Sequence, residues 1–319
     1  MLKTEKFKPT KKIKEDEITA AVTGVPLWVK IILYVITTGL AISTLIPLLL
    51  TVSISLMDAD ALATHGYTLF PKEISFEAYK YILNNGAKIW RSYGVTIFVT
   101  ISGTILGLAM MTLYAYAISR KYFPWRNIFT FFIFFTMLFN GGTVPSYIVI
   151  TQILHLQDKI GVLILCGCLS TMYILIMRTY MQTSIPDAVV ESAKIDGAGE
   201  FLCYYKIVLP MAVPTIATIA LFLAIAYWNA WYPGFLYILQ NEDIVPIQLL
   251  LKRIENQVQF LNSNASSLSY AESEKLRQAL PSDAVKMCLV VMIALPILIA
   301  YPFFQRFFIQ GITIGAVKG

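Results

Sequence analysis

The chain has 319 residues, of which 57% are hydrophobic and only 14% are charged, and its net charge is +6. Soluble domains carry about 25% charged residues, so this composition excludes an ordinary soluble protein and indicates an integral membrane protein. In such a protein a positive net charge reflects the orientation in the bilayer, so no nucleic-acid partner is expected.

The N-terminal segment 1–30 is predicted to be a cytoplasmic tail. It contains seven lysines, and the apolar run that follows it is longer than the roughly 7 to 15 residues of a cleaved signal peptide. Placing this tail inside the cell also places most of the Lys and Arg residues there, as the positive-inside rule requires. The sequence therefore predicts that both termini lie in the cytoplasm.

Six apolar stretches have about the length needed to cross a bilayer, which takes about 20 residues in a helix. The predicted fold class is all-α, with one six-helix membrane domain over residues 31–309. A cytoplasmic loop (179–212), an extracellular loop (241–285) and a cytoplasmic C-terminal tail (310–319) complete the chain. The six predicted spans cover about 31–57, 94–119, 127–150, 160–178, 213–238 and 286–306.

The uncharged interiors of these spans contain none of the ionisable groups that ion-driven carriers use as relays, which disfavours a secondary carrier. The chain has no G-x-x-x-x-G-K-[ST] phosphate loop. It also shows no catalytic constellation and no cysteine or histidine pattern with metal-ligand spacing. We therefore expect no catalytic residue, no metal site and no bound cofactor, and any energy for transport must come from a partner.

The third predicted span is interrupted by Asn140, Gly141 and Gly142, with Pro145 just beyond. Backbone groups freed by such a break are tolerated within a bilayer only against protein or a water-filled path. The break therefore predicts either part of a substrate path or a packing kink.

The fifth predicted span carries a cluster of aromatic side chains beside an amide in its outer half. Rings provide flat apolar faces and an amide provides a donor and an acceptor, which is typical of sugar-binding surfaces. An aromatic belt at the outer headgroups explains the rings equally well. The candidate path residues are Asn140, Gly141, Gly142, Tyr147, Trp228, Asn229, Trp231 and Tyr232.

The cytoplasmic loop 179–212 is predicted to form a helix, a turn and a second helix. Ser184 is placed to cap the first helix, with Pro186 in its first turn. Gly197 can adopt the left-handed conformation that ends this helix. Pro210 then marks the start of the fifth span.

The same loop resembles the EAA loop of the permease subunits of bacterial ABC importers, whose pattern is E-A-A-x3-G-x9-I-x-L-P. The spacing matches throughout, with Ser192 in place of the middle alanine. The resemblance implies a coupling helix that docks in a cleft of a cytoplasmic ATPase subunit, with Glu191 as the charged contact and Gly197 as the turn. The alternative is a simple linker between two spans. The implied coupling residues are Glu191, Ser192, Ala193, Asp196, Gly197, Ile207, Leu209 and Pro210.

Further segments are similar to the oligosaccharide-uptake permeases related to maltose permease (MalG), and most similar to their LplC-like branch. This resemblance implies the type I ABC importer permease fold, also called MetI-like, and a multi-pass protein of the bacterial cytoplasmic membrane. The implied partners are a second homologous permease, two ABC ATPase subunits that bind ATP and Mg, and an extracellular solute-binding lipoprotein. The segments are 139–145, 228–229, 281–287 and 301–319.

The predicted function is translocation of an oligosaccharide, coupled to ATP hydrolysis by the separate ATPase subunits. The chain itself is not expected to be an enzyme. Because the coupling loop reports the energy source and not the cargo, a permease for another polar solute, such as a glycerol-phosphate or a peptide, is the main alternative. A secondary carrier is the remaining one.

Overall fold

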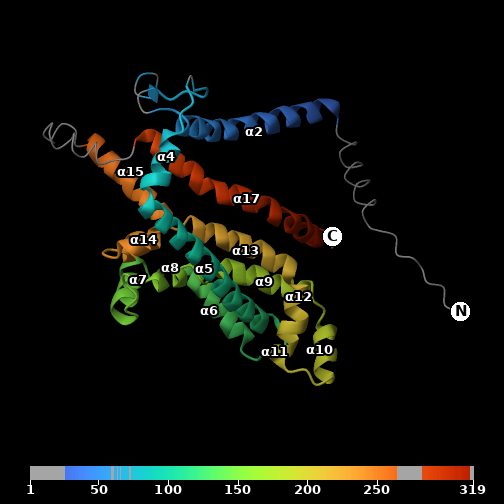
Figure 1. Cartoon of the computed structure of the whole chain (residues 1–319). Coiled ribbons are helices and arrows are strands. Elements are labelled where there is room, and N and C mark those ends of the chain that lie inside the picture. The colour runs from blue at the N-terminus through green and yellow to red at the C-terminus, as the bar shows by residue number, and fades with distance from the viewer. Residues whose placement is uncertain are drawn as a thin grey trace.

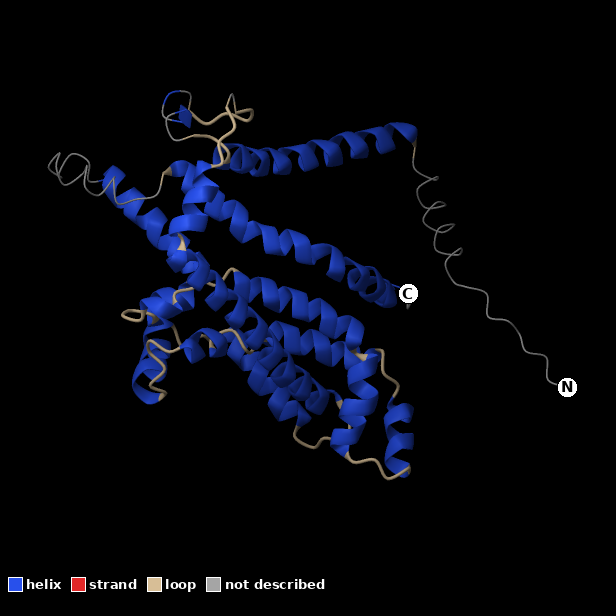
Figure 2. Cartoon of the chain, viewed as in Figure 1, coloured by secondary structure: helices blue, strands red, loops and turns tan. Residues whose placement is uncertain are grey.

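A computed structural model describes residues 26–58, 61–62, 64, 66–71, 73–263 and 282–316. All regular elements in this part of the chain are helices (Figure 2), which confirms the predicted all-α class. Most of the predicted tail 1–30, the middle of the predicted loop 241–285 and the last three residues of the tail 310–319 lie outside the described residues.

Three described helices are long and apolar enough to cross a bilayer without a break. They are α2 (Leu27–Ser55), α5 (Ala87–Ser119) and the part of α17 (Asp283–Ala316) that runs from Asp283 to Ala300. They correspond to the first, second and sixth predicted spans. Helix α17 continues without interruption into the segment predicted as the C-terminal tail.

The third predicted span is a bent pair of helices. Helix α6 (Arg126–Leu138) ends before the predicted break, and α7 (Thr143–Ile148) with the π-helical turn η1 (Val149–Ile153) follows at an angle of 113°. Gly142 has a φ of +90°, and its amide donates to the side-chain oxygen of Asn140 at 2.9 Å. The predicted break is confirmed, and its angle is too large for a packing kink.

The fourth and fifth predicted spans also consist of shorter helices. Residues 160–178 do not form one helix, because α8 (Ile160–Leu165) and α9 (Thr171–Thr183) are separate. Helix α13 (Val213–Trp228) ends well before residue 238, and the short helix α14 (Tyr232–Tyr237) follows it. The helical segment Glu200–Met211 and α13 form a second bent pair, at an angle of 79°. Counting each bent pair as one span gives up to five candidate spans among the described residues.

Tyr227 explains why α8 and α9 are separate. Its hydroxyl donates to the carbonyl of Ile164 at 2.5 Å. In a continuous helix that carbonyl would accept the amide of Cys168, which here bonds to Leu165 instead. A Cβ on Gly167 would lie only 2.8 Å from the Tyr227 ring, so the chain can pass the ring at this point because residue 167 is glycine.

Helix α5 lies at the centre of the helix group and packs against α6, α8, α9 and α13 (Figure 1). Helix α2 contacts α17 near its own C-terminal end, while most of the length of α2 is exposed. Gly103 and Gly107 form a G-x-x-x-G pattern on α5 that allows close approach of neighbouring backbone. A Cβ on Gly103 would lie 2.4 Å from the Tyr227 ring, and one on Gly107 would lie 2.9 Å from the Cys168 carbonyl oxygen.

The shorter elements gather at the two ends of this helix group, as Figure 1 shows. One end carries the helices of the predicted cytoplasmic loop, and the opposite end carries the helices that flank the breaks. The loop elements are α10 (Asp187–Ile195), α11 (Glu200–Cys203), η2 (Tyr204–Val208) and α12 (Leu209–Met211). The opposite end holds α4 (Glu77–Asn85), η3 (Glu242–Ile244) and α15 (Ile247–Ser263), together with α7 and α14.

Replacing Gly103 with Ala tests this packing. We expect Gly103→Ala to destabilise the purified protein by about 1–3 kcal/mol, because the added methyl group overlaps the Tyr227 ring. Gly94→Ala on the same helix is the matched control, since a Cβ there meets nothing within 4 Å and the gain in helix propensity is the same. Thermal unfolding in detergent measures both, and equal midpoints would contradict the prediction.

Candidate functional site

The predicted helix-turn-helix of the cytoplasmic loop is present as α10 followed by α11. The prediction that Ser184 caps the first helix is wrong. Ser184 follows the end of α9, where its amide donates to Tyr180, and the N-cap of α10 is Pro186. Ser184 stands two residues before that N-cap, so no side-chain bond caps α10.

Gly197 forms the turn between the two helices, as predicted. Its φ of +89° lies in the left-handed region, which residues with a Cβ rarely adopt. The amide of Gly197 donates to the Lys194 carbonyl at 3.0 Å, and the amide of Ala198 donates to the Ala193 carbonyl at 2.9 Å. This pair of bonds is the Schellman motif, which satisfies the last carbonyls of α10 and fixes the direction in which α11 leaves.

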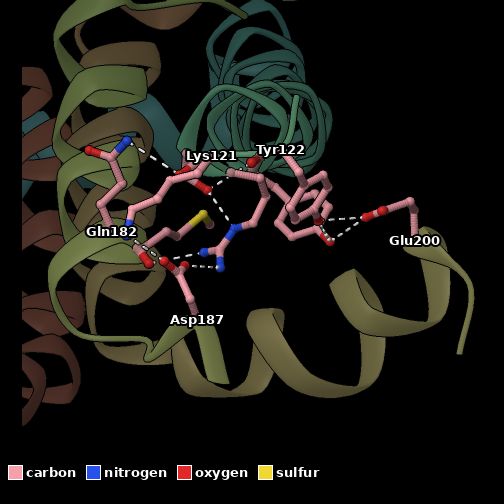
Figure 3. A network of polar contacts seen from close by, with 9 residues as sticks. Lys121, Tyr122, Gln182, Asp187 and Glu200 are labelled. Atoms are coloured by element: carbon pink, nitrogen blue, oxygen red, sulfur yellow. Dashed lines mark hydrogen bonds and ion pairs between the residues drawn. The ribbon is translucent and has the colours of Figure 1, made fainter. Parts of the chain in front are cut away.

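The start of α11 is attached to the membrane helices through Glu200. Its carboxylate accepts hydrogen bonds from Tyr116 of α5 at 2.9 Å and from Tyr122 at 2.8 Å (Figure 3). It also pairs with Lys194 of α10. Burial raises the pKa of Glu200, but the ammonium and the two hydroxyls outweigh burial, so the pKa is lowered. Burial and the adjacent carboxylate raise the pKa of Tyr122 to about 12, so this hydroxyl remains a donor at neutral pH.

The start of α10 is attached through Asp187. Its carboxylate lies 2.9 Å from the ammonium of the exposed Lys121 and 3.6 Å from the guanidinium of Arg120, which is buried. The hydrogen bond from Lys121 lowers the pKa of Asp187, and the charge of Arg120 adds to this effect. Both cations directly follow α5, so the two loop helices are held at the same end of that helix (Figure 3).

Several apolar side chains of the loop are exposed, and we call this set the loop face. Ile195 is 86% exposed and Phe201 is 81% exposed, whereas Val190 and Cys203 are buried. The other exposed apolar side chains of the loop face are Val189, Leu202 and Tyr205. Of the predicted coupling residues, Glu191, Ser192, Asp196, Gly197 and Pro210 are exposed, and Ala193, Ile207 and Leu209 are half-buried.

At the opposite end the structure brings the break in the third predicted span close to the aromatic cluster of the fifth. The hydroxyls of Thr143 and Tyr232 lie 3.5 Å apart, and the rings of Tyr147 and Tyr237 stack with centroids 5.8 Å apart. Asn140, Gly141 and Gly142 are exposed beside this contact. Residues from the third and fifth predicted spans therefore form one surface, which we call the outer surface because the predicted orientation places it outside the cell.

The fifth-span residues divide into two groups. Trp228 is buried, donates its indole N–H to the Ile293 carbonyl at 3.0 Å, and so belongs to the packing of α13 on α17. Asn229 and Trp231 are exposed on the outer surface, where Gln248 donates to the Asn229 side chain at 3.2 Å. The ammonium of Lys252 lies 5.8 Å from the centre of the Trp231 ring.

Sequence reasoning missed the residues that hold these surfaces in place. Asp158, at a φ of +53°, accepts three backbone amides at 2.8, 2.9 and 3.2 Å from the segment after α14, and these bonds lower its pKa. Arg120 and Glu200 are two further residues of this kind, since no sequence motif indicates the contacts that they make. The available signal was an arginine directly after a long apolar run, because a charge at such a position needs a partner.

Comparison with known proteins matches residues 115–314 to the family model of the binding-protein-dependent transport system inner membrane component. The polygalacturonan/rhamnogalacturonan transport system permease protein YtcP of Bacillus subtilis (strain 168) is 33% identical, over 88% of this chain and 94% of its own length. Protein LplC of the same organism is 34% identical, over 88% of this chain and 92% of its own length.

A solved structure is also similar. It is a chain from a bacterial ABC transporter involved in the import of the acidic polysaccharide alginate. That chain superposes with a TM-score of 0.74 at 28% sequence identity, and the match covers 95% of this chain and 100% of the other.

Replacing Gly197 with Ala tests the turn. We expect Gly197→Ala to destabilise the α10–α11 turn by about 1 kcal/mol, because residue 197 has a φ of +89°, which is strained for alanine. This loss of stability should raise the rate of amide exchange about fivefold. Gly199→Ala is the control, since its φ is −71° and a Cβ there also meets nothing within 4 Å. Hydrogen exchange over 187–203 measures the effect. Equal exchange in the two variants would show that the turn does not depend on a left-handed residue.

Proposed function

Since this chain belongs to the family of binding-protein-dependent transport system inner membrane components, we propose that it is the permease subunit of an ATP-binding-cassette importer that carries an oligosaccharide. It forms the membrane path together with a second, homologous permease. Two ATPase subunits bind ATP and Mg and hydrolyse the ATP, and an extracellular solute-binding lipoprotein delivers the sugar.

The observation that carries this proposal is the exposed apolar loop face at one end of the helix group. Ile195 and Phe201 are large apolar side chains that are more than four-fifths exposed, which is typical of a surface that a partner covers. Glu191 and Asp196 are exposed on the same helix-turn-helix and add charge beside the apolar side chains. We propose that this surface is the coupling element that enters a cleft of the ATPase.

The arrangement of the ends supports the orientation that the sequence predicts. The start of α2 and the end of α17 lie on the same side as α10 and α11 (Figure 1). If the loop face meets a cytoplasmic ATPase, both termini are cytoplasmic. Closure of the ATPases on ATP then moves the loop and turns the helices from inward-open to outward-open by rigid-body rocking.

The outer surface supports a sugar as cargo. Trp231 and Tyr232 offer exposed ring faces, and Asn229 with Gln248 offers amide donors and acceptors. We propose that the cargo carries carboxylates, because Lys252, which pairs with Glu255 at 2.9 Å in the free chain, places a cation beside Trp231 for which a cargo carboxylate can compete. The permease YtcP belongs to a polygalacturonan/rhamnogalacturonan system and the solved transporter imports alginate, which supports this class.

Charge placed on the loop face tests the docking proposal. We expect Ile195→Asp and Phe201→Asp to lower co-purification of the ATPase subunits about tenfold or more, because burial of an unpaired charge at an interface costs several kcal/mol. Phe70→Asp is the control, since Phe70 is 87% exposed but lies in the segment between α2 and α4. Undiminished co-purification with the loop variants would exclude this surface as the ATPase contact.

Selective loss of acidic cargo tests the role of Lys252. In liposomes that contain the complete importer, we expect Lys252→Gln to lower uptake of an oligogalacturonide about tenfold, since a charge-assisted hydrogen bond is lost. Uptake of the corresponding neutral galactose oligosaccharide should not change. Lys159→Gln is the control, because Lys159 is also an exposed cation but lies between η1 and α8. Equal loss of both sugars, or loss of glycerol-phosphate uptake alone, would contradict the assignment of a uronate cargo.

A further inference from the structure

We infer that Arg120 is a positioning residue that fixes the coupling loop to the inner end of α5, and that α5 carries the movement of this loop to the outer surface. The inference rests on the proposed function, because it concerns how an ATPase-driven movement reaches the sugar path. Four contacts of one side chain, a second attachment at Glu200 and the continuity of α5 carry the argument.

Arg120 joins three elements through a single buried side chain. Its side chain is 2% exposed, and its guanidinium donates to Ser119 at the end of α5 and to the carbonyl of Met181 in α9, both at 3.0 Å. It also lies 5.5 Å from the ring centre of Tyr116 and 3.6 Å from the carboxylate of Asp187 in α10. A buried cation is stable only among such partners, so α10 cannot move away from α5 without exposing or unpairing this charge.

One donor of this guanidinium is not yet satisfied. Among the described residues its Nη1 atom is buried without a hydrogen-bond partner, and the atom it faces is the Asp187 carboxylate oxygen at 3.6 Å. A shift of α10 toward α5 by less than 1 Å would bring this pair within hydrogen-bond distance. The contact therefore favours movements in which α10 presses on α5 and opposes those in which it separates.

The second attachment prevents the loop from pivoting about the first. Tyr116, one turn before the end of α5, donates to Glu200 at the start of α11. The buried hydroxyl of Thr112, one turn further back, lies 2.8 Å from the hydroxyl of Tyr204. Since both loop helices are fixed to the same helix at different points, the loop moves with α5 as one body.

Helix α5 is suited to carry this movement because it is unbroken over 33 residues, or about 50 Å. The other helices of its group are interrupted by breaks within the predicted spans: α6 ends at Leu138, α8 at Leu165 and α13 at Trp228, and α9 begins only at Thr171. At the outer end, the buried hydroxyl of Thr96 accepts the amide of Ile247 at 2.9 Å. This bond attaches α5 to the start of α15, the helix that carries Gln248 and Lys252.

Ion pairs strengthen the outer attachment. Lys88 near the start of α5 pairs with Glu242 at 2.6 Å, and Arg91 pairs with Asp243 of the same short helix η3. Glu242 also accepts from Arg253 of α15 at 2.7 Å. Helix α5 is therefore attached at its inner end to the coupling loop and at its outer end to the elements that border the proposed sugar surface.

The test separates loop attachment from loop docking. Arg120→Met removes the charge but keeps an unbranched apolar side chain, and the partly exposed Asp187 keeps Lys121 as its partner in this variant. We expect the complex to assemble and to keep its basal ATP hydrolysis. Stimulation of hydrolysis by sugar-loaded binding protein should fall about fivefold or more, the size of a typical coupling free energy. Lys121→Gln is the matched control, because Lys121 contacts the same carboxylate but is 79% exposed.

A distance measurement supplies a readout that a merely stabilising residue would not change. Spin labels at Ala188 of α10 and Asn256 of α15, both exposed, report whether the two ends move as one body. The exposed Cys166 is replaced with Ser in this background. We expect the distance to stay the same on ATP binding in the native chain and to change or broaden in Arg120→Met.

The outcomes distinguish the two proposals. If Arg120→Met keeps full stimulation and an unchanged distance, the inference about Arg120 and α5 is overturned while the importer function stands. If Arg120→Met only lowers the amount of assembled complex, with normal stimulation per complex, Arg120 is structural and the inference is again overturned. If the native complex shows no stimulation by the loaded binding protein, the proposed function itself fails.

Discussion

A membrane helix can break only where other groups bond to the backbone it frees, and this constraint organises the whole structure. At three of the breaks among the described helices, a side chain bonds to the backbone beside the break. Asn140 accepts the amide of Gly142, the Tyr227 hydroxyl donates to Ile164, and the side chain of Asn229 donates to the Ile225 carbonyl at 3.0 Å. Because hydrocarbon offers no substitute bonds, these three side chains decide where the helices bend and therefore where polar surface is exposed.

The breaks lie toward one end of the helix group and the charged attachments of the coupling loop lie at the other. This separation suits a protein that takes up a polar solute on one side and receives force on the other. Helix α5 connects the two ends, and its glycines at 103 and 107 let the broken helices pack closely around it. The unbroken helix thus supplies rigidity, while the broken ones supply polar groups.

The buried contacts stabilise the position of the loop more than the exposed ion pairs do. The side chains of Lys88, Arg91 and Lys121 are more than half exposed, and ion pairs at such exposed positions contribute at most about 1 kcal/mol each to stability. Arg120 and the Thr96–Ile247 bond are buried, where losing a partner costs more. The loop and α15 are therefore held mainly by a few buried bonds to α5.

The sequence by itself determined the helical class, the break at Asn140–Gly142 and the turn at Gly197, because local chemistry dictates each of them. Apolar length requires helices, and a glycine is needed wherever φ is positive. Only the tertiary structure decided the break between α8 and α9, the burial of Trp228 and the partners of Arg120. Tyr227 and Ile164 are 63 residues apart, and Arg120 and Asp187 are 67 apart, so no local pattern could reveal that they meet. Those long-range contacts join the loop and the proposed sugar surface through α5.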